Sequence, residues 1–466
     1  MTTRVEPEAR PGFRPFSWRF VTPLYISSAL NPINSSLIAT GMVPIAAALG
    51  VPVGQAAVLV SALYLASAVA QPTAGKLAEL YGPRRVFITG IALVLLGGVV
   101  GGLGGSLTWL TVARVLIGVG TSAGYPAAMV IIRRRATWAG LTEPPGNVLG
   151  GLSIAGTVTV AVGPPIGGLL ISLFSWRAAF WANVPVTLIA LTLAVLWIPK
   201  DSAIERRSLR DSASLMDIVG IVLFAGMMSA LLVFLLTLPG LVWPALGLFV
   251  VLAAALVIWE LRARTPFIDM RLLVRNLALT RTYLRGALTL LAFYTVLYGL
   301  TQWLEAGHGL TPQAAGLVML PMGLLAAMIS KPISAKNLIR GPLILGASVL
   351  VVATASVLFF DSSTSVLLIV AVTLLFAITL GTTTVGNQTA LYEQAPPEHL
   401  GTAAGLFRTF SYLGSIASSA VTGIVFRNDV TDGGLHTIAV VLVGTSVLVL
   451  LMTLFDRKLR GRRSAL

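Results

Sequence analysis

Long apolar stretches recur from one end of the sequence to the other, separated by short polar breaks that hold most of the charged residues. A helix needs about 20 predominantly apolar residues to cross the hydrocarbon core of a bilayer. Helices suit that environment because each satisfies its own backbone hydrogen bonds where no water is present. We therefore expect fourteen membrane-spanning helices, at residues 19–42, 53–74, 85–105, 107–131, 147–172, 178–198, 216–237, 242–259, 283–304, 312–333, 340–359, 364–388, 401–425 and 437–455.

Basic residues lie mainly on one side of this predicted arrangement. The chain has 32 Lys and Arg residues, and 28 of them fall in the termini or in connections that follow even-numbered spans. Short connections rich in Lys and Arg stay in the cytoplasm. We therefore expect cytoplasmic termini in a multi-pass protein of the cytoplasmic membrane, with the lipid bilayer as a partner. Retention of basic residues on the cytoplasmic side accounts for the net charge of +15. Nucleic-acid binding would instead need a basic soluble domain with base-reading side chains, and the sequence shows none.

Residue types argue against several classes of chemistry. The chain has no Cys and three scattered His, so we expect no disulfide, no metal site and no cofactor. No GxxxxGK[ST] segment is present, which argues against ATP use. A membrane enzyme would need paired carboxylates or His ligands near one membrane face, which the scattered His residues do not offer. A sensor or scaffold would need a further soluble domain, which the short polar segments disfavour. We therefore expect a protein that is not an enzyme.

Two longer polar breaks divide the predicted spans into groups of six, two and six. Six-span halves related by approximate symmetry, with a binding site between them, are a recurring transporter design. We expect a first six-helix half at residues 1–199, a cytoplasmic linker with two inserted helices at 200–279 (the helices at about 216–237 and 242–259), and a second six-helix half at 280–466.

Six segments carry a resemblance to one transporter family: "GKLAELYGPRRV" (75–86), "ARVLIGVGTSAG" (113–124), "AVGPPIGGLL" (161–170), "SWRAAFWANVP" (175–185), "TPQAAGLVMLP" (311–321) and "NQTALYEQAPPEHLGTAAGLFRTFSYLG" (387–414). Over most of its length the chain resembles the major facilitator superfamily, in particular the fourteen-span drug:proton antiporters. This resemblance implies an all-α polytopic fold of two six-helix halves plus two additional helices. It also implies secondary active export of small amphipathic compounds (drug or multidrug efflux) by alternating access, coupled to protons. We expect a monomer.

The first of these segments is expected to act as a gate. Gly75 would allow close helix approach and Gly82 would turn the short connection that continues into Arg84 and Arg85. The resemblance implies that Glu79 docks against the helix beginning at residue 401, whose N-terminus carries partial positive charge. A contact made in only one conformation biases an alternating-access equilibrium. Retention of basic residues in the cytoplasm would explain the arginines alone, but not Glu79 with both glycines.

The third segment predicts a smooth helix face. Gly163 and Gly167, together with Gly168, present no side chains, and Pro164 and Pro165 interrupt the regular hydrogen bonding of a helix. Such a face would pack against a helix of the second half in one conformation and release it in another. Ordinary packing of helices through small residues explains the same pattern equally well.

Proton coupling rests on few acidic residues. The resembled group usually has an acid in its first span, and Ser35 stands at that position in "NSSLIATGMVP" (34–44). Ser does not carry a proton at physiological pH. Of the 17 acids, only Glu305, at the outer end of the ninth span, lies outside the predicted cytoplasmic segments and outer loops. An ionisable group in the membrane is a functional hypothesis by default, so Glu305 is the proton-carrier candidate; an interfacial polar residue is the alternative. A proton-independent facilitator or exchanger of a metabolite or lipid therefore stays open.

Arg114 lies inside the fourth span without an acidic mate nearby in sequence, so its charge must meet helix carbonyls, water or an anion. The resemblance implies a role in coupling. With Arg408 and no acid at the midplane, the cavity is predicted to favour neutral or anionic amphiphiles, although Arg408 also suits a snorkelling role toward the cytoplasm. Ligand sites are mostly apolar with a few placed polar groups. The corresponding candidates for the substrate cavity are Asn31, Asn34, Gln71, Tyr125, Tyr294, Tyr298, Gln302 and Asn387.

Overall fold

The structure, a computed structural model of the chain, describes residues 15–141, 145–201, 217–237, 240–264, 266–268, 270–335, 338–395 and 400–459. All regular elements in these ranges are helices, as predicted. Within the described residues, twelve helices are long and apolar enough to cross a membrane. Two further helices, α8 with 28 residues and α19 with 26, contain some side chains outside the described set and bring the number of spans to about fourteen. The chain is a multi-pass membrane protein.

The six spans before the linker are built from eleven helical segments: α1 (Trp18–Leu37), η1 (Ile38–Gly41) and α2 (Met42–Leu49), then α3 (Val53–Ala56) and α4 (Val58–Tyr81), α5 (Pro83–Leu103), α6 (Leu107–Ser122) and α7 (Gly124–Trp138), α8 (Gly146–Leu173), and finally α9 (Ala178–Trp181) and α10 (Asn183–Trp197). The first span is longer than predicted. It ends where Gly50 adopts a φ of 64°, a left-handed conformation that commonly closes a helix.

The last six spans follow a short helix, α14 (Met270–Arg275). They contain α15 (Leu277–Thr295) with η2 (Val296–Leu300) and η3 (Trp303–Gly307), then α16 (Pro312–Ala335), α17 (Arg340–Val357), α18 (Val366–Gln394), α19 (Leu400–Val425) and α20 (Asp432–Phe455), and a final turn, η5 (Arg457–Leu459). The first of these spans begins before the predicted residue 283. Asn276 caps α15 by accepting a hydrogen bond from the Leu279 backbone N–H at 3.2 Å.

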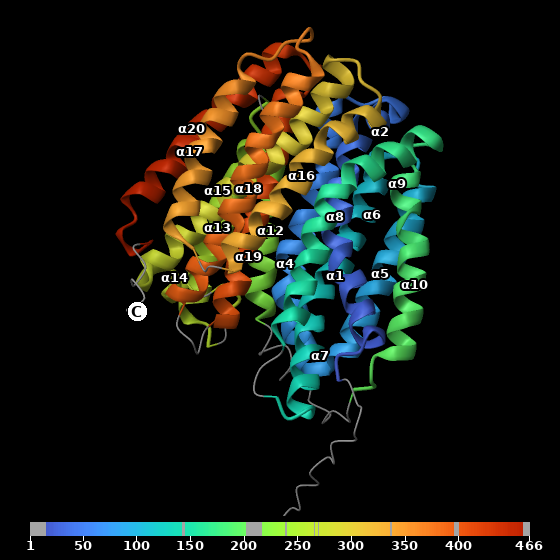
Figure 1. Ribbon diagram of the computed structural model, residues 1–466, viewed down its shortest axis with the longest axis vertical. Coiled ribbons are helices and arrows are strands. Elements are labelled where there is room, and N and C mark those ends of the chain that lie inside the picture. Colours follow the sequence, from blue (N-terminus) through green and yellow to red (C-terminus); the bar gives the residue numbers. More distant parts are fainter. Residues whose placement is uncertain are drawn as a thin grey trace, which may run out of the picture.

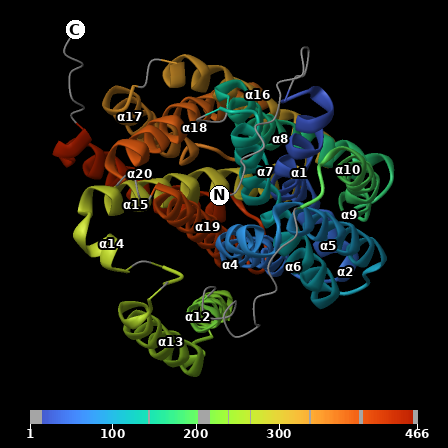
Figure 2. The ribbon, with the colours of Figure 1, turned by 90° about the horizontal axis from the view of Figure 1, so that it is seen from below.

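The inserted helices α12 (Ile218–Thr237) and α13 (Trp243–Arg262) pack against each other at the edge of the bundle, and α12 contacts α4 and α19 (Figure 2). Asp217 joins the ends of this pair: its carboxylate accepts hydrogen bonds from Trp259 Nε1 at 2.6 Å and from the Phe267 backbone N–H at 2.9 Å. Most of α13 is exposed and apolar, which suits contact with lipid.

The two sets of six spans lie side by side in Figure 1, with blue and cyan helices facing yellow and orange ones. The most extensive contacts between them are α8 against α16 and α4 against α19. These two seams position the residues of the candidate site between the halves.

Candidate functional site

The halves meet closely on the side away from the charged cytoplasmic connections. The Gly54 backbone N–H donates to the Phe426 carbonyl at 2.9 Å, and the hydroxyls of Ser61 and Ser419 are 2.5 Å apart. A Cβ at Gly54 would lie 2.6 Å from the Phe426 carbonyl oxygen, so only glycine permits this approach. These contacts close the outer side of the seam between α4 and α19.

A cavity of about 320 Å³ lies between the halves on the cytoplasmic side of these contacts. Along α4 the closed contacts involve Ser61, whereas the cavity is lined by Gln71, which is further toward the cytoplasm. Along α19 the corresponding residues are Ser419 and Tyr412. The structure is therefore inward-facing. Four of the predicted cavity residues line this space: Asn31, Gln71, Tyr125 and Tyr294.

The other four predicted cavity residues lie outside this lining and bond to neighbouring groups: Asn34, Tyr298, Gln302 and Asn387. Asn34 donates to the Asn183 side chain at 2.6 Å, and Gln302 donates to the Tyr298 carbonyl at 3.0 Å. Asn387 accepts from Arg285 Nε at 2.6 Å. Polar residues in membrane helices often bond to their own or a neighbouring helix in this way, and sequence does not distinguish them from residues that face a cavity.

Tyrosines form the boundary between the cavity and the closed outer side. Tyr294 stacks on Tyr298 with ring centroids 5.6 Å apart, and the hydroxyls of Tyr64 and Tyr298 are 3.1 Å apart. The Tyr298 hydroxyl donates to the Ser35 backbone carbonyl at 2.8 Å. Ser35, where the resembled group usually has an acid, thus supplies a fixed acceptor that joins the two halves.

Arg114 finds helix carbonyls, the first of the environments considered for it. Its Nε donates to the Leu59 carbonyl and its Nη1 to the Asn34 carbonyl, both at 3.0 Å. Nη2 has no hydrogen-bond partner among the described residues, although the side chain is buried. The guanidinium therefore connects α6 to α4 and α1, and its Nη2 group makes no hydrogen bond to the described residues.

The predicted gating loop is held by an acid that the sequence analysis did not select. Gly82 has a φ of 97°, and the Asp201 carboxylate occupies the space of a Cβ there. The backbone N–H groups of Arg84 and Arg85 donate to Asp201 at 3.2 and 3.0 Å. A carboxylate at the N-terminus of α5 is favoured by the helix dipole. An acid directly after the sixth span, beside several basic residues, was the available signal.

Two expectations for this loop have different outcomes. A Cβ at Gly75 would make only an ordinary contact of 3.7 Å with Pro126, so this conformation does not require glycine there. Glu79 is exposed on α4. The side chains of residues 400–402, where it was expected to dock, lie outside the described residues. The docking of Glu79 stays a prediction.

The glycine-rich face of α8 divides between two neighbours. Gly163 and Gly167 pack on α1, where a Cβ would collide with Ser36 and Leu37. Gly168 instead packs on the Pro312 carbonyl of α16, and Gly316 of α16 packs on Pro164 and Pro165. Pro164 therefore faces the second half, whereas Gly163 and Gly167 do not. A backbone-to-backbone approach of this kind closes the outer side of the seam.

Replacing Gly316 with leucine should shift the protein toward an outward-facing conformation. A Cβ at this position would lie 2.8 Å from the Pro164 carbonyl carbon, and backbone cannot yield as a flexible side chain can. The chain has no Cys, so a single Ser61→Cys reports access from outside. We expect severalfold faster labelling in the Gly316→Leu background. Gly444→Leu, where a Cβ meets nothing within 4 Å, is the control, and equal labelling of both backgrounds would contradict the role of this seam.

Glu305 lies in η3, one of two π-helical turns that interrupt the span beginning with α15. Its side chain is 8% exposed, and neither carboxyl oxygen has a hydrogen-bond partner among the described residues. Isolated π-turns occur frequently at functional sites. The neighbouring Trp303 donates from Nε1 to Asp432 at 2.8 Å, which fixes this turn against α20. Glu305 is thus a buried acid whose carboxyl oxygens have no hydrogen-bond partner among the described residues.

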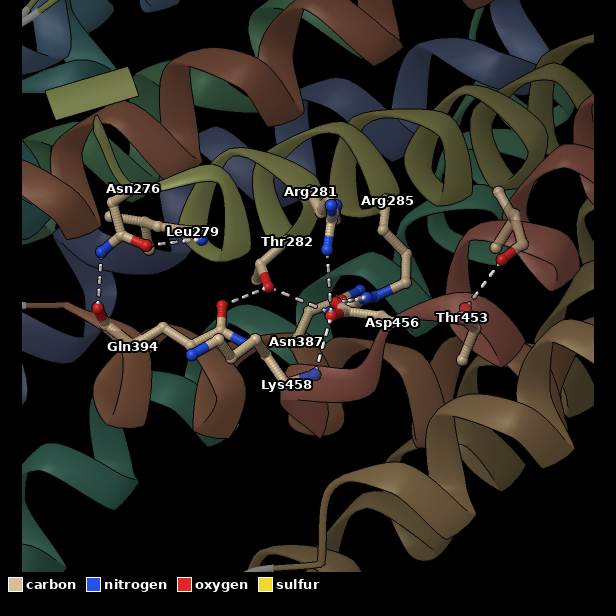
Figure 3. Close-up of polar contacts among 11 residues, drawn as sticks. Asn276, Leu279, Arg281, Thr282, Arg285, Asn387, Gln394, Thr453, Asp456 and Lys458 are labelled. Atoms are coloured by element: carbon tan, nitrogen blue, oxygen red, sulfur yellow. Dashed lines mark hydrogen bonds and ion pairs between the residues drawn. The ribbon is translucent and has the colours of Figure 1, made fainter. Parts of the chain in front are cut away.

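A second buried charge cluster, shown in Figure 3, was not selected from the sequence. Arg285 is fully buried, and its Nη1 lies 3.5 Å from the Asp456 carboxylate. Its other nitrogens donate to Asn387 at 2.6 Å and to Thr282 at 3.0 Å. The cluster joins α15, α18 and the end of α20. It explains the position of Asn387 away from the cavity.

The family described as the Major Facilitator Superfamily matches residues 24–419. The chain belongs to this superfamily. Its fold and family are those of transporters, and the predicted family is confirmed.

Curated relatives of this superfamily member include transporters of bacteria. It is 33% identical to an uncharacterised MFS-type transporter, YwoD of Bacillus subtilis, over 92% of this chain and 95% of that one. It is 29% identical to the tetracenomycin C resistance and export protein of Streptomyces glaucescens, over 90% and 78%. The multidrug resistance protein Stp of Mycobacterium tuberculosis is 27% identical, over 79% and 68%.

Solved structures share the fold at low identity. A structure described for proton-dependent oligopeptide transporters aligns with a TM-score of 0.68 and 14% identity, covering 95% of this chain and 98% of that chain. A mutant form of the nucleoside transporter NupG aligns with a TM-score of 0.64 and 13% identity, covering 94% and 100%. These likenesses concern the fold alone.

Proposed function

We propose that this transporter exports small amphipathic compounds from the cytoplasm and that inward proton movement drives the export. The observation that carries the proposal is the cavity between the halves, which faces the cytoplasm and combines aromatic and aliphatic walls with neutral polar groups and one arginine. Such a surface suits compounds that are apolar with a few polar atoms. Relatives named for drug resistance and export support the same direction of transport.

Glu305 is the proposed proton carrier. A carboxyl group removed from water and left without hydrogen-bond partners binds a proton more readily. Its carboxyl oxygens have this environment among the described residues, and it lies toward the outer side, from which protons would enter. Arg114 would act indirectly, by holding α1, α4 and α6 together during the conformational change.

The alternative is a facilitator or exchanger that moves a metabolite or lipid without protons. Ser35 favours it, because the usual acid of the first span is replaced by a residue that does not titrate. The two candidates differ in one respect, namely whether a proton gradient can drive net movement of the compound.

Transport into proteoliposomes distinguishes these candidates. Vesicles with an acidic interior are mixed with a panel of cationic, neutral and anionic amphiphiles, and protein-free vesicles correct for passive partition. We expect at least one compound to accumulate above its external concentration, because protons leave as the compound enters. Accumulation should cease when an ionophore removes the gradient. Protein-dependent entry that only equilibrates, with or without the gradient, would identify a facilitator.

A further inference from the structure

Arg408 lies inside the cavity, in contrast to the snorkelling role that the sequence also allowed. It extends from α19 and places its guanidinium carbon 3.8 Å from the ring centroid of Tyr125 on α7. Both residues line the cavity. A snorkelling arginine instead extends its charged group toward the membrane interface. Arg408 and Tyr125 therefore meet across the two halves, within the space a transported compound would occupy.

The charge of Arg408 is not balanced within the cavity. Among the described residues that line it, Arg408 is the only one with a formal charge, and none is acidic. No ion pair joins Arg408 to a described carboxylate. It rests instead on the face of an aromatic ring, which a guanidinium contacts without losing its positive charge. The cavity thus presents one uncompensated cation.

The other arginine considered for this role is unsuitable. Two nitrogens of Arg114 already donate to the carbonyls of Leu59 and Asn34, and this residue does not line the cavity. A compound inside the cavity would therefore meet the guanidinium of Arg408 alone.

We propose that the cavity takes aromatic amphipathic anions and that Arg408 selects them by binding their carboxylate or sulfonate group. This inference rests on the proposed function and specifies its substrate class. A guanidinium offers planar, paired donors that match a carboxylate. Three aromatic residues that line the same cavity, Phe293, Tyr294 and Tyr412, supply surface for the apolar part of the compound. An opposite charge is favoured most where water is scarce.

Binding an anion at this place also has a conformational consequence. The guanidinium that bridges to Tyr125 would turn toward the carboxylate or be shared with it. The contact between α7 and α19 at the cytoplasmic side would then depend on whether the cavity is occupied. A compound with differential contacts in the two conformations can shift their equilibrium.

Equilibrium binding tests this proposal without any proton gradient. Purified protein in nanodiscs is titrated against three xanthene dyes that share one ring system: anionic fluorescein, zwitterionic rhodamine B and cationic rhodamine 6G. We expect wild type to bind fluorescein about tenfold more tightly than rhodamine 6G. Arg408→Gln should weaken fluorescein binding by roughly 10- to 100-fold, the range for a hydrogen bond to a charged group, and should leave rhodamine 6G nearly unchanged.

Two further variants refine the result. Arg408→Lys keeps the charge without the planar donors, so it should retain the preference for fluorescein at lower affinity. Arg275→Gln removes a charge from the exposed surface of α14 and should bind all three dyes as wild type does. The wild-type preference among the dyes keeps the test valid even where a variant at position 408 does not fold.

The outcomes separate the substrate class from transport itself. Equal or tighter binding of rhodamine 6G by wild type, or fluorescein binding that ignores Arg408→Gln, would overturn the proposal while leaving amphiphile export intact. Failure of wild type to bind any of the three dyes would count against the proposed function and against this inference together.

Discussion

Replacing Glu305 with glutamine should reduce gradient-driven accumulation by roughly tenfold or more, because the glutamine amide cannot bind and release a proton as a carboxyl group in the membrane can. Glutamine has the shape of the protonated acid, so the fold and the binding of the compound should persist. Exchange of labelled for unlabelled compound, which needs no net proton movement, should therefore continue at a rate close to that of wild type. Proteoliposome uptake with and without an imposed gradient measures both quantities.

Asp361→Asn is the matched control for this variant. Asp361 lies in an outer loop, and hydrogen bonds donated by Ser363 and Thr364 hold the pKa of its carboxyl below the ordinary value. A lowered pKa keeps the group ionised at neutral pH, so it cannot release and rebind a proton during transport. Accumulation by this variant should match wild type. Undiminished accumulation by Glu305→Gln would remove Glu305 from the mechanism.

Replacing Asp456 with asparagine should lower the free energy of unfolding by about 3–5 kcal/mol, the usual cost of leaving a buried charge without its partner. Arg285 is fully buried and would keep its positive charge, with only Asn387 and Thr282 as neutral partners. Asp456 also accepts from the Lys458 backbone N–H at 3.2 Å, so the end of α20 would loosen as well. Thermal unfolding of the purified protein in detergent measures the loss.

Asp456 also pairs with a second arginine, which allows the buried and the exposed ion pair to be compared. Arg281 lies 3.6 Å from Asp456, but its side chain is 47% exposed. Exposed ion pairs contribute about 0–1 kcal/mol, so Arg281→Gln should be nearly neutral. Similar destabilisation by Arg281→Gln and Asp456→Asn would show that burial of Arg285 does not determine the stability of this cluster.

The spans were predictable because the bilayer imposes length and apolarity on every helix that crosses it. Their ends were less so. The first span continues past residue 42 to Gly50, and the ninth begins at Leu277, because local caps and turns decide where a helix stops. The pattern of apolar residues along the chain does not indicate where such caps lie.

The candidate site was only partly predictable. Asn31, Gln71, Tyr125 and Tyr294 line the cavity, but Asn34 and Asn387, which are the same residue type as Asn31, do not. All three asparagines bond to neighbouring side chains, so such a bond does not decide which of them reaches the cavity. The direction a polar residue faces depends on the rotation of its helix against its neighbours, which a single sequence does not specify.

Charges at the cytoplasmic ends of helices were the hardest to interpret. Asp201 and Asp456 follow apolar spans, where a charged residue is ordinarily explained by the membrane interface. In the structure Asp201 caps α5 and Asp456 neutralises Arg285. Both roles depend on partners more than 100 positions away in sequence, so only the packing of the helices reveals them.

Substrate-driven proton movement tests the central claim most directly. Proteoliposomes are loaded with a transported amphiphile and a pH-sensitive dye and are diluted into buffer of equal pH that lacks the amphiphile. An antiporter must admit protons as the amphiphile leaves, so the interior should acidify, and Glu305→Gln should abolish the change. Protein-dependent loss of the amphiphile at constant internal pH would contradict the account and identify the chain as a facilitator.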